Sequence, residues 1–583
     1  MKNSPSFRSI FINSGKDTPM TSTEVIEIPE NIRSKYDPRS LVEWFFHWEK
    51  ETPDRVFLRQ PNGDQWIEYT WKQVGDEARR MTSYLKSQGL VKGDHVGLIS
   101  KNCSHWIIAD LAIMMGGYIS VPLYPNLVGE QLNQVLEHSE VKLLFVGKVD
   151  EWDSMKKGIP ETLPCLTLPE SHVEDYDKWQ DIIAKNDPLT ESDIPDEMDL
   201  CTIIYTSGTT GSPKGVMYNH KQLKFTAAAA KYVINFGDKR HRYFSYLPLC
   251  HVAERMIIEL GALHCGGVIS FAESLDTFMQ NLSNAQPTMF FAVPRIWTKF
   301  QMGVWEKMPQ SKLDFLLKLP IISGIVKKKI RIGLGINEAE YCLTAAAPCP
   351  PSLHKWYNAL GIQLLELYGM TENVGACTLM HPDNVKMGTV GQPYRGSVLK
   401  IEEETGEILM QAPWLMQGYY KEPAMTASVL KNGFLHTGDM GEIDDEGFLK
   451  ITGRVKDTFK TSKGEYIVPG PIEWGYSLNG YIEQICVLGR GLPQPVALVV
   501  ISDKALKKNR VDVEKSLVDT MNMVNKDLVD YERVRKVIVM KEPWTMENGI
   551  LTPKMSIKRN VLEGKYEENL QTWYATENTV IWT

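Results

Sequence analysis

Short apolar runs alternate with helically spaced apolar positions along the first two thirds of the chain. Runs at 94–100, 118–123 and 202–206 are rich in β-branched and aromatic residues, which is typical of buried strands. The segment 71–88 instead repeats its apolar residues every three or four positions and is followed by Gly89, a common helix stop. Strands that alternate with helices of this length predict parallel sheets whose faces are covered by helices.

The same criteria extend this pattern to about residue 370 and then show a change. We expect further helices from Leu41, at 106–115 and at 222–234, and further strands at 66–69, 141–146, 243–247, 267–271, 288–293 and 341–344. After Gly396, short alternating strands replace the βα units, and Asp445-Glu446-Gly447 forms the turn of a predicted hairpin. Beyond Arg454 the chain is rich in Lys and punctuated by Gly.

These changes in the pattern of predicted elements and in composition predict an α/β protein with more than one domain. We expect a leader at 1–35, a large N-terminal domain at 36–454 and a small C-terminal α/β domain at 455–583. The large domain would contain sheet-based βα subdomains plus a small β subdomain. A chain of 583 residues is too long for a single hydrophobic core, which supports the division.

Composition and charge exclude several classes of protein. The chain is 43% hydrophobic and 23% charged with a net charge of −8, so it has no basic domain that would favour nucleic acid as a partner. Its nine cysteines form no CxxC pair and stand mostly in apolar runs, which indicates reduced core cysteines in a cytoplasmic protein. No apolar run reaches the roughly eighteen residues of a membrane-spanning helix, and the N-terminus lacks the apolar block of a secretory signal.

One segment, residues 313–330, differs from the rest of the pattern. Its sequence LDFLLKLPIISGIVKKKI begins apolar, is interrupted by Pro320 and Gly324, and ends in three lysines. A basic-ended apolar segment can lie on an anionic membrane surface. It can also be a buried element followed by a solvated charge run, and we favour this second interpretation. Peripheral membrane contact through 313–330 is the alternative.

The stretch that follows the predicted strand at 202–206 is the best candidate for binding chemistry. Glycines with no side chain let backbone N–H groups converge on a ligand, hydroxyls add donors, and a lysine adds a point charge suited to phosphate. The order of residues differs from the P-loop of GTPases and kinases, where Lys follows Gly and precedes Ser or Thr. A flexible surface turn is the alternative. The candidate polyphosphate ligands are Thr206, Ser207, Gly208, Thr209, Thr210, Gly211 and Lys214.

Four further segments carry residue types suited to a nucleotide. The small residues Ala346, Ala347 and Pro348 follow a predicted strand and would permit close approach of a flat base. Thr371 and Glu372 place a hydroxyl beside a carboxylate, which suits a Mg²⁺ ion that also holds phosphate oxygens, although Thr-Glu can also start a helix. The other two segments are His436-Thr437-Gly438-Asp439, whose carboxylate would follow a tight turn, and Gly453-Arg454-Val455-Lys456-Asp457.

These five motifs, in this order, resemble the ATP-binding segments of the adenylate-forming superfamily. That superfamily comprises acyl-CoA synthetases, peptide-synthetase adenylation domains and firefly-type luciferases. The resemblance implies a small C-terminal domain that rotates about a hinge at Lys456. It also implies adenine stacking by Tyr368 beside Gly369, an α-phosphate contact by Thr371, Mg²⁺ binding by Glu372, ribose contacts by Asp439 and Arg454, and a thiol entry path faced by Lys463 and Gly464.

The position of the C-terminal lysine that relatives use in the first half-reaction is ambiguous. The matching stretch is Leu551-Thr552-Pro553-Lys554-Met555-Ser556-Ile557-Lys558-Arg559. Its similarity to long-chain synthetases puts Ser556 at the expected lysine, whereas alignment with shorter bacterial ligases puts Lys558 there. We favour Lys558 and keep Lys554 as the alternative.

Two segments, 246–255 and 291–297, resemble the long-chain acyl-CoA synthetase branch. The resemblance therefore implies an ATP-dependent long-chain fatty acid–CoA ligase that forms an acyl-AMP intermediate with Mg²⁺ and transfers the acyl group to CoA. Its expected catalytic residues are Thr206, Lys214, His251, Glu372 and Lys558, although His251 can equally be a satisfied core histidine. A fatty acyl-AMP ligase that loads a carrier protein, or a pseudoenzyme that binds adenylate, are the alternatives.

Overall fold

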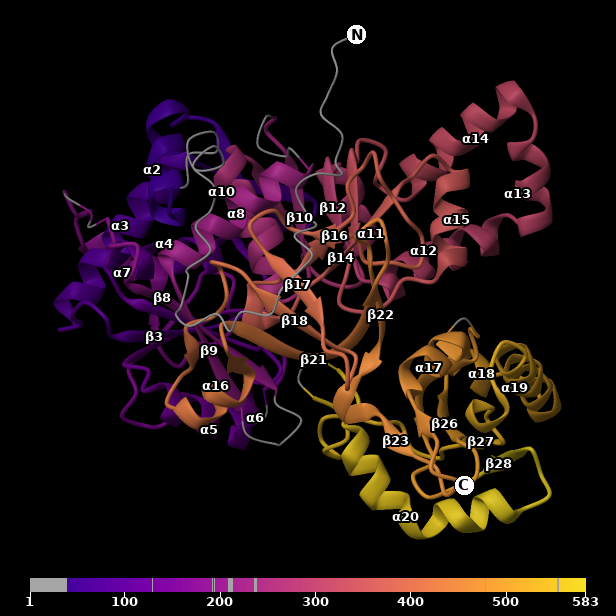
Figure 1. Ribbon diagram of the computed structural model, residues 1–583. Coiled ribbons are helices and arrows are strands. Elements are labelled where there is room, and N and C mark those ends of the chain that lie inside the picture. The colour runs from indigo at the N-terminus through magenta and orange to yellow at the C-terminus, as the bar shows by residue number, and fades with distance from the viewer. Residues whose placement is uncertain are drawn as a thin grey trace.

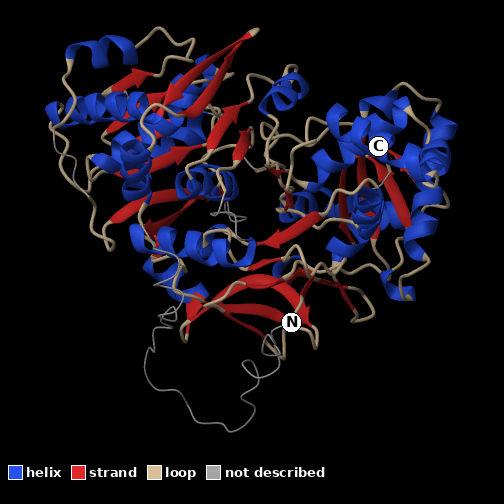
Figure 2. Ribbon diagram, turned by 90° about the horizontal axis from the view of Figure 1, so that it is seen from above, coloured by secondary structure: helices blue, strands red, loops and turns tan. Residues whose placement is uncertain are grey.

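The computed structural model describes residues 39–583 apart from 128, 191, 193, 208–212, 235–238, 478 and 553–554. The leader expected at 1–35 lies outside the described residues. Two large sheets form the framework of the large part of the described chain, and helices pack against them (Figures 1 and 2). This arrangement confirms the α/β class that the alternation of apolar runs predicted.

The first sheet has nine described strands, and its central strands run parallel. β13 and β14 are neighbours in it, with Thr344 opposite Glu366, so the chain leaves both strands at the same edge. Ligands bind at this carboxyl edge in open α/β sheets. In spatial order the strands are β16 (Gln392–Pro393), β15 (Thr378–Leu379), β14 (Leu364–Tyr368), β13 (Tyr341–Thr344), β12 (Met289–Phe291), β10 (Arg242–Ser245), β11 (Val268–Phe271), β1 (Val56–Asn62) and β2 (Gln65–Thr70).

The second sheet has eight described strands, and the two that flank the hydroxyl- and glycine-rich motif are second and third from one edge. Strands β4, β3, β5, β6 and β7 run parallel, as the apolar runs predicted. In spatial order the strands are β19 (Gly418–Tyr419), β9 (Pro213–Asn219), β8 (Leu200–Ser207), β4 (Ile119–Leu123), β3 (His95–Ile99), β5 (Leu143–Val146), β6 (Cys165–Thr167) and β7 (Asp177–Lys178).

Helix α4 (Ser104–Met115) lies between the two sheets, in contact with β3 and β4 of one and β1 of the other. Every residue of α4 is buried, as expected for a helix that is apolar on all sides. Its one acidic residue, Asp110, pairs with Arg255 of the π-helix η3 (Arg255–Leu260), and both side chains are fully buried. This pair links the helix to the strand that leads into the motif, because Arg255 also donates to Thr202 of β8.

The segments predicted as helices from Leu41, at 71–88 and at 222–234 are helical to within a few residues, whereas no bounds were predicted for the others. Fourteen α-helices besides α4 are described in the large part. They are α2 (Leu41–Glu51), α3 (Trp71–Ser87), α5 (Gly129–Ser139), α6 (Trp152–Lys156), α7 (Trp179–Lys185), α8 (His220–Ile234), α9 (Val252–Glu254), α10 (Gly261–Cys265), α11 (Phe278–Ala285), α12 (Pro294–Lys307), α13 (Gln310–Leu317), α14 (Pro320–Gly333), α15 (Pro351–Ala359) and α16 (Pro423–Val429). None of the described helices combines the length and apolarity that crossing a bilayer requires.

A small antiparallel sheet follows, where short alternating strands were expected. Its described strands are β17 (Val398–Ile401), β18 (Glu407–Gln411), β20 (Leu430–Lys431), β21 (Phe434–Ile443) and β22 (Leu449–Arg454). The predicted hairpin turn joins β21 to β22, and Gly447 has the positive φ of 82° that the turn requires.

The C-terminal elements lie together beside this sheet, at the lower right of Figure 1. They form a four-stranded sheet with its own apolar clusters and a short hairpin. The hydrogen bond from Asn126 to Met546 (3.7 Å) and the ion pair between Arg295 and Glu483 join them to the large part. The elements are β23 (Phe459–Lys460), β24 (Tyr466–Ile467), α17 (Pro469–Ser477), β25 (Ile482–Leu488), β26 (Val496–Ile501), α18 (Asp503–Leu506), α19 (Arg510–Asn525), β27 (Lys536–Val539), α20 (Arg559–Ala575) and β28 (Val580–Trp582).

The segment 313–330 forms two helices that project from the molecule, α13 and α14, at the upper right of Figure 1. Leu313 is the one buried residue of α13, and α14 has none. The expectation that this apolar stretch is a buried element is therefore wrong for α14. The reason is geometric, because only the side of α14 that carries Val326 and Ile330 packs against the neighbouring core.

Candidate functional site

The described ends of the hydroxyl- and glycine-rich motif belong to two paired strands. β8 and β9 pair antiparallel, with Thr206 opposite Lys214 and Ser207 opposite Pro213. Gly208, Thr209, Thr210 and Gly211 lie outside the described residues, so their part in a phosphate site stays a prediction.

The predicted loop is too long, because Pro213, Lys214 and Gly215 belong to strand β9. Proline is accepted at the first residue of a strand, where its missing N–H breaks no interior ladder bond. A side chain at Gly215 would place its Cβ 2.7 Å from Cγ2 of Ile203 on the neighbouring strand. The Pro-Lys-Gly sequence therefore fits a strand that packs closely, and it fixes the starting point of the Lys214 side chain.

Tyr419 on strand β19 joins this hairpin to the carboxylate of Glu372. β19 pairs with β9, and its Tyr419 lies opposite Val216. The Tyr419 hydroxyl donates a hydrogen bond to Oε1 of Glu372 (2.7 Å), and Nζ of Lys214 lies 5.4 Å from the centre of the Tyr419 ring. Sequence reasoning missed Tyr419, since nothing local in its sequence distinguishes it from a core tyrosine.

Glu372 is held rigidly directly after strand β14. It lies in a short 3₁₀ helix, Thr371–Asn373, and its backbone carbonyl accepts a hydrogen bond from the N–H of Met416 (2.9 Å). A Cβ at Gly369 would lie 2.1 Å from the carbonyl oxygen of Gly375, so only glycine fits at that position. Among the described residues, Tyr419 alone hydrogen-bonds to the carboxylate, which leaves its second oxygen for a cation.

Asp439 is the second carboxylate of the candidate site, after Glu372. Its Oδ2 accepts from the hydroxyl of Tyr368 (2.7 Å), and its Oδ1 pairs with Nε of Arg454 (2.8 Å). The expected tight turn before Asp439 is instead a bulge within β21, where Gly438 has a φ of 74°. The structure thus brings together Tyr368, Asp439 and Arg454 from three different strands.

The charges around Lys214 favour the binding of an anion. Burial, and then the nearby positive charge of Lys456, lower the pKa of Lys214, and Glu372 offsets part of that effect. A desolvated ammonium group with a second cation close by gains stability when a negatively charged group binds between them. Lys214, Lys456 and Glu372 therefore form a mixed-charge group suited to a metal-bound polyphosphate.

The small-residue turn after β13 leaves the sheet beside Tyr368. Ala346 has a φ of 68°, an uncommon value for a residue with a Cβ, and both Ala346 and Ala347 are exposed. Strained backbone of this kind clusters at binding sites. The predicted contact of this turn with a base remains a prediction, and its place at the carboxyl edge of the sheet agrees with it.

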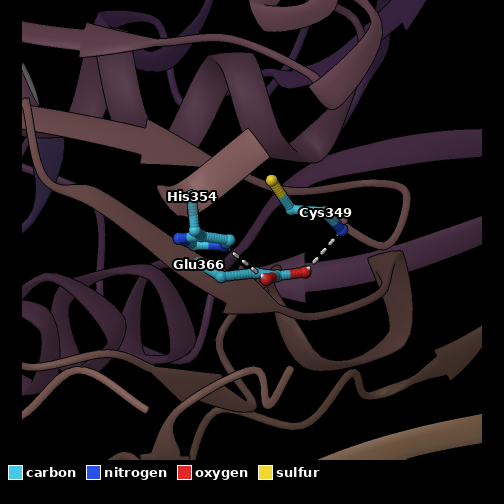
Figure 3. A group of neighbouring side chains, drawn as sticks. All are labelled: Cys349, His354 and Glu366. Atoms are coloured by element: carbon cyan, nitrogen blue, oxygen red, sulfur yellow. Dashed lines mark hydrogen bonds and ion pairs between the residues drawn. The ribbon is translucent and has the colours of Figure 1, made fainter. Parts of the chain in front are cut away.

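A buried clamp fastens the far end of this turn (Figure 3). Glu366 on β14 accepts a hydrogen bond from the backbone N–H of Cys349 (3.0 Å) through Oε1, and its Oε2 lies 3.2 Å from Nε2 of His354 on α15. Ligand atoms of these three residues lie within 4.8 Å of one another. Burial raises the pKa of the Cys349 thiol, which disfavours the thiolate that a metal requires, and both carboxylate oxygens are occupied. The group is therefore a positioning clamp.

The other predicted residues lie apart from these contacts. His251 is half-buried and caps helix α9, its Nδ1 accepting from the N–H of Ala253 (3.2 Å). Lys463 and Gly464 form the exposed turn between β23 and β24. Among the described residues, no hydrogen bond or ion pair joins that turn to Glu372 or Asp439.

The ambiguity about the C-terminal lysine persists. Lys558 is half-buried directly before α20, and its N–H donates to the carbonyl of Ile550 (2.8 Å). Ser556 is exposed, and Lys554 lies outside the described residues. The catalytic role assigned to Lys558 stays a prediction.

An apolar cavity of about 70 Å³ lies close to Glu372, because Val374, two residues later in the chain, lines it. Val374, Gly375 and Ala376 form one wall of it. The opposite walls come from α8, η3 and α10, through residues such as Ala227, Met256 and Gly261. Among the described lining residues none is charged, and the polar ones are Thr226 and Tyr394. The cavity therefore suits a hydrocarbon group, and its described lining offers no carboxylate for a buried amine.

Comparison with known proteins gives matches over nearly the whole chain. A model of the AMP-binding enzyme family matches residues 45–420, and one of the AMP-binding enzyme C-terminal domain matches 456–578. Long-chain-fatty-acid–CoA ligase 5 of Mus musculus is 30% identical over 587 residues, covering 88% of this chain and 85% of the mouse protein. Fatty acyl-CoA synthetase A of Dictyostelium discoideum is 28% identical over 578 residues, covering 88% and 86%.

Solved structures share the fold at lower sequence identity. The anthranilate CoA ligase AuaEII in complex with anthranoyl-AMP has a TM-score of 0.74 and 19% identity, covering 90% of this chain and 97% of that chain. The A-PCP didomain of a carboxylic acid reductase from Segniliparus rugosus in complex with AMP has a TM-score of 0.77 and 23% identity, covering 94% and 84%. These likenesses establish the fold of the chain.

Proposed function

The chain belongs to the AMP-binding enzyme family of adenylate-forming acyl-CoA ligases, and from this premise we propose that it joins a long-chain fatty acid to CoA. ATP would first convert the acid to an acyl-adenylate, and CoA would then displace AMP. The observation that carries the proposal is the uncharged apolar cavity whose wall begins two residues after Glu372. This cavity supports the proposal because it offers room for a hydrocarbon group close in the chain to Glu372, the proposed Mg²⁺ ligand.

In the first half-reaction, a carboxylate oxygen of the acid attacks the α-phosphorus of ATP, and pyrophosphate leaves. Catalysis of this kind depends on positioning and on stabilisation of phosphate charge. Lys214 would bind the polyphosphate from strand β9, and Asp439 would accept hydrogen bonds from the ribose hydroxyls. Mg²⁺ would neutralise charge on the phosphates, with the free oxygen of Glu372 as its protein ligand, and Tyr419 would hold that carboxylate in place.

In the second half-reaction, the thiol of CoA attacks the acyl carbonyl carbon, and the C–O bond to AMP breaks. We propose that residues 455–583 rotate as a unit about Lys456 between the two steps, as domain-closure enzymes do. The exposed turn at Lys463 and Gly464 would then reach the path of the thiol. The hydrogen bond of Asn126 with Met546 and the ion pair of Arg295 with Glu483 cross the boundary at exposed positions, so a rotation could break and remake them.

The size of the cavity bears on the acyl chain. A single water takes up about 30 Å³ in the liquid, so a cavity of about 70 Å³ holds only a short part of a long chain. Met256 and Met289 line it, and methionine side chains change rotamer at low energetic cost. We propose that these two side chains move when a long acyl chain enters.

The test is ATP–pyrophosphate exchange with carboxylic acids of increasing chain length, followed by product analysis with CoA. The proposal expects exchange that depends on long-chain acids and an acyl-CoA thioester when CoA is present. Exchange without a CoA thioester would instead favour an acyl-AMP ligase that serves a carrier protein. Nucleotide binding without exchange for any acid would favour a pseudoenzyme that binds adenylate. That alternative arises because Ser556 stands where long-chain synthetases are expected to have the lysine.

A further inference from the structure

Helix α14 exposes isoleucines that its packing does not require. Ile321, Ile325 and Ile332 are 83%, 54% and 49% exposed. Spacings of four and seven residues put these three side chains on one face of the helix. Val326 and Ile330 pack against the neighbouring core from the other side. The outward isoleucines therefore form an apolar stripe that is separate from the helix's own core contact.

Basic residues surround this stripe. Lys328 follows Ile325 by three positions and precedes Ile332 by four, so its side chain lies within the stripe, and Lys329 beside it is also exposed. The helical hairpin 310–333 carries six basic residues and one acidic residue, in a chain whose net charge is −8. The local charge is thus opposite in sign to the charge of the whole protein.

Helix α13 repeats the combination of exposed apolar and basic side chains. Phe315 is 62% exposed, and Lys312 and Lys318, three positions before and after it, are exposed as well. The two helices pack against each other and project from the molecule, so they reach solvent as one unit (Figure 1). Exposed apolar patches with a polar rim mark interaction sites.

We propose that the α13–α14 hairpin docks the protein on the surface of an anionic membrane. A helix whose apolar side chains alternate with lysines lies in the interface plane of a bilayer, its apolar face among the acyl chains and its lysines at the headgroups. The excess of positive charge selects an anionic lipid surface over a neutral one. The contact brings the enzyme to the phase in which an amphiphilic acid is dissolved, yet it does not depend on the ligase reaction.

Sedimentation with vesicles tests the proposal on the full chain. The vesicles are made either of phosphatidylcholine alone or of phosphatidylcholine with phosphatidylserine. We expect binding to the anionic vesicles only. The triple variant K327A/K328A/K329A should bind about one hundredfold more weakly, given the contribution of each lysine near such a surface. The double variant I321S/I325S should bind about tenfold more weakly or worse, because it removes apolar area from the interface.

Matched variants elsewhere on the surface control for charge and exposure. K142A/K157A/K185A removes three exposed lysines, and V91S/L275S removes two exposed apolar side chains, so both should bind like the wild type. Thermal melting checks that all variants fold. The proposal is overturned if the wild type ignores anionic vesicles, or if the controls lose as much binding as the hairpin variants. Concentration-dependent self-association that I321S/I325S abolishes, without vesicle binding, would also overturn it in favour of a protein–protein contact.

Discussion

The substitution Asp439→Asn tests how the second carboxylate of the site acts. Asp439 is 5% exposed, accepts the Tyr368 hydroxyl at 2.7 Å and pairs with Arg454 at 2.8 Å. Asparagine keeps the shape and one acceptor oxygen but removes the charge. Because the side chain of Arg454 is 59% exposed, the lost ion pair should lower the free energy of unfolding by no more than about 1 kcal/mol.

The effect on nucleotide binding should be larger. Hydrogen bonds that ribose hydroxyls donate to a carboxylate are worth roughly 1.5–3 kcal/mol, because the acceptor is charged. The dissociation constant for MgATP should therefore rise about ten- to one-hundredfold in D439N. Isothermal titration calorimetry measures this constant, and thermal melting measures stability on the same samples.

Two further variants isolate the cause. Tyr368→Phe keeps the charge of Asp439 and removes one donor, so its loss of affinity should be smaller than that of D439N. Asp445→Asn changes an exposed turn residue and should bind MgATP normally. If D439N binds MgATP as tightly as the wild type while remaining folded, the carboxylate does not hold the ribose and the reasoning is refuted.

Four other substitutions test the proposed roles of individual residues. Glu366→Gln weakens the clamp on the small-residue turn, so the KM for ATP should rise several-fold with little change in kcat; an unchanged KM would mean that the clamp does not position the turn. Lys558→Ala should slow pyrophosphate release about tenfold, a barrier increase of about 1.4 kcal/mol, whereas a comparable loss in Lys554→Ala alone would move the role to that lysine. Burial raises the pKa of Glu254 to about 8, against 4.5 for the unfolded chain, so the stability that its protonated form provides is present in full below 4.5 and is lost as pH rises through about 8. Glu254→Gln should therefore flatten the fall in melting temperature between about pH 5 and pH 8, and parallel curves for the two proteins would contradict this.

Local sequence patterns were sufficient to predict the class of the fold and many of the strands and helices of its large part. The apolar run at 94–100 became β3, and the helical spacing at 71–88 became α3, because burial on both faces or on one face leaves a readable period. The place of Glu372 after strand β14 also followed from the apolar run before it, whereas Asp439 lies within β21 and not after the expected turn. The pairing of β9 with β19 brings Lys214 beside Tyr419, and no local pattern records such pairing between distant strands.

The features that the sequence did not predict also depend on contacts between distant parts of the chain. Tyr419 bonds to Glu372 across 47 positions of sequence, so only the folded chain reveals it. Pro213 and Gly215 disfavour strands in general, and their place in β9 depends on the strand beside it. For α14, an apolar composition predicted burial, but the orientation of the helix against α13 and the neighbouring core decided which isoleucines face water.

The central claim is that residues of β8 and β9 and Glu372 together bind the triphosphate of one ATP molecule with its Mg²⁺ ion. Calorimetric titration of the full chain with ATP, with Mg²⁺ and after its removal by a chelator, tests it most directly. The account predicts saturable binding of MgATP at a single site, weaker binding without Mg²⁺, and a loss of about tenfold or more in both Lys214→Ala and Glu372→Gln. Absence of binding, or equal affinity in the wild type and both variants, would contradict it.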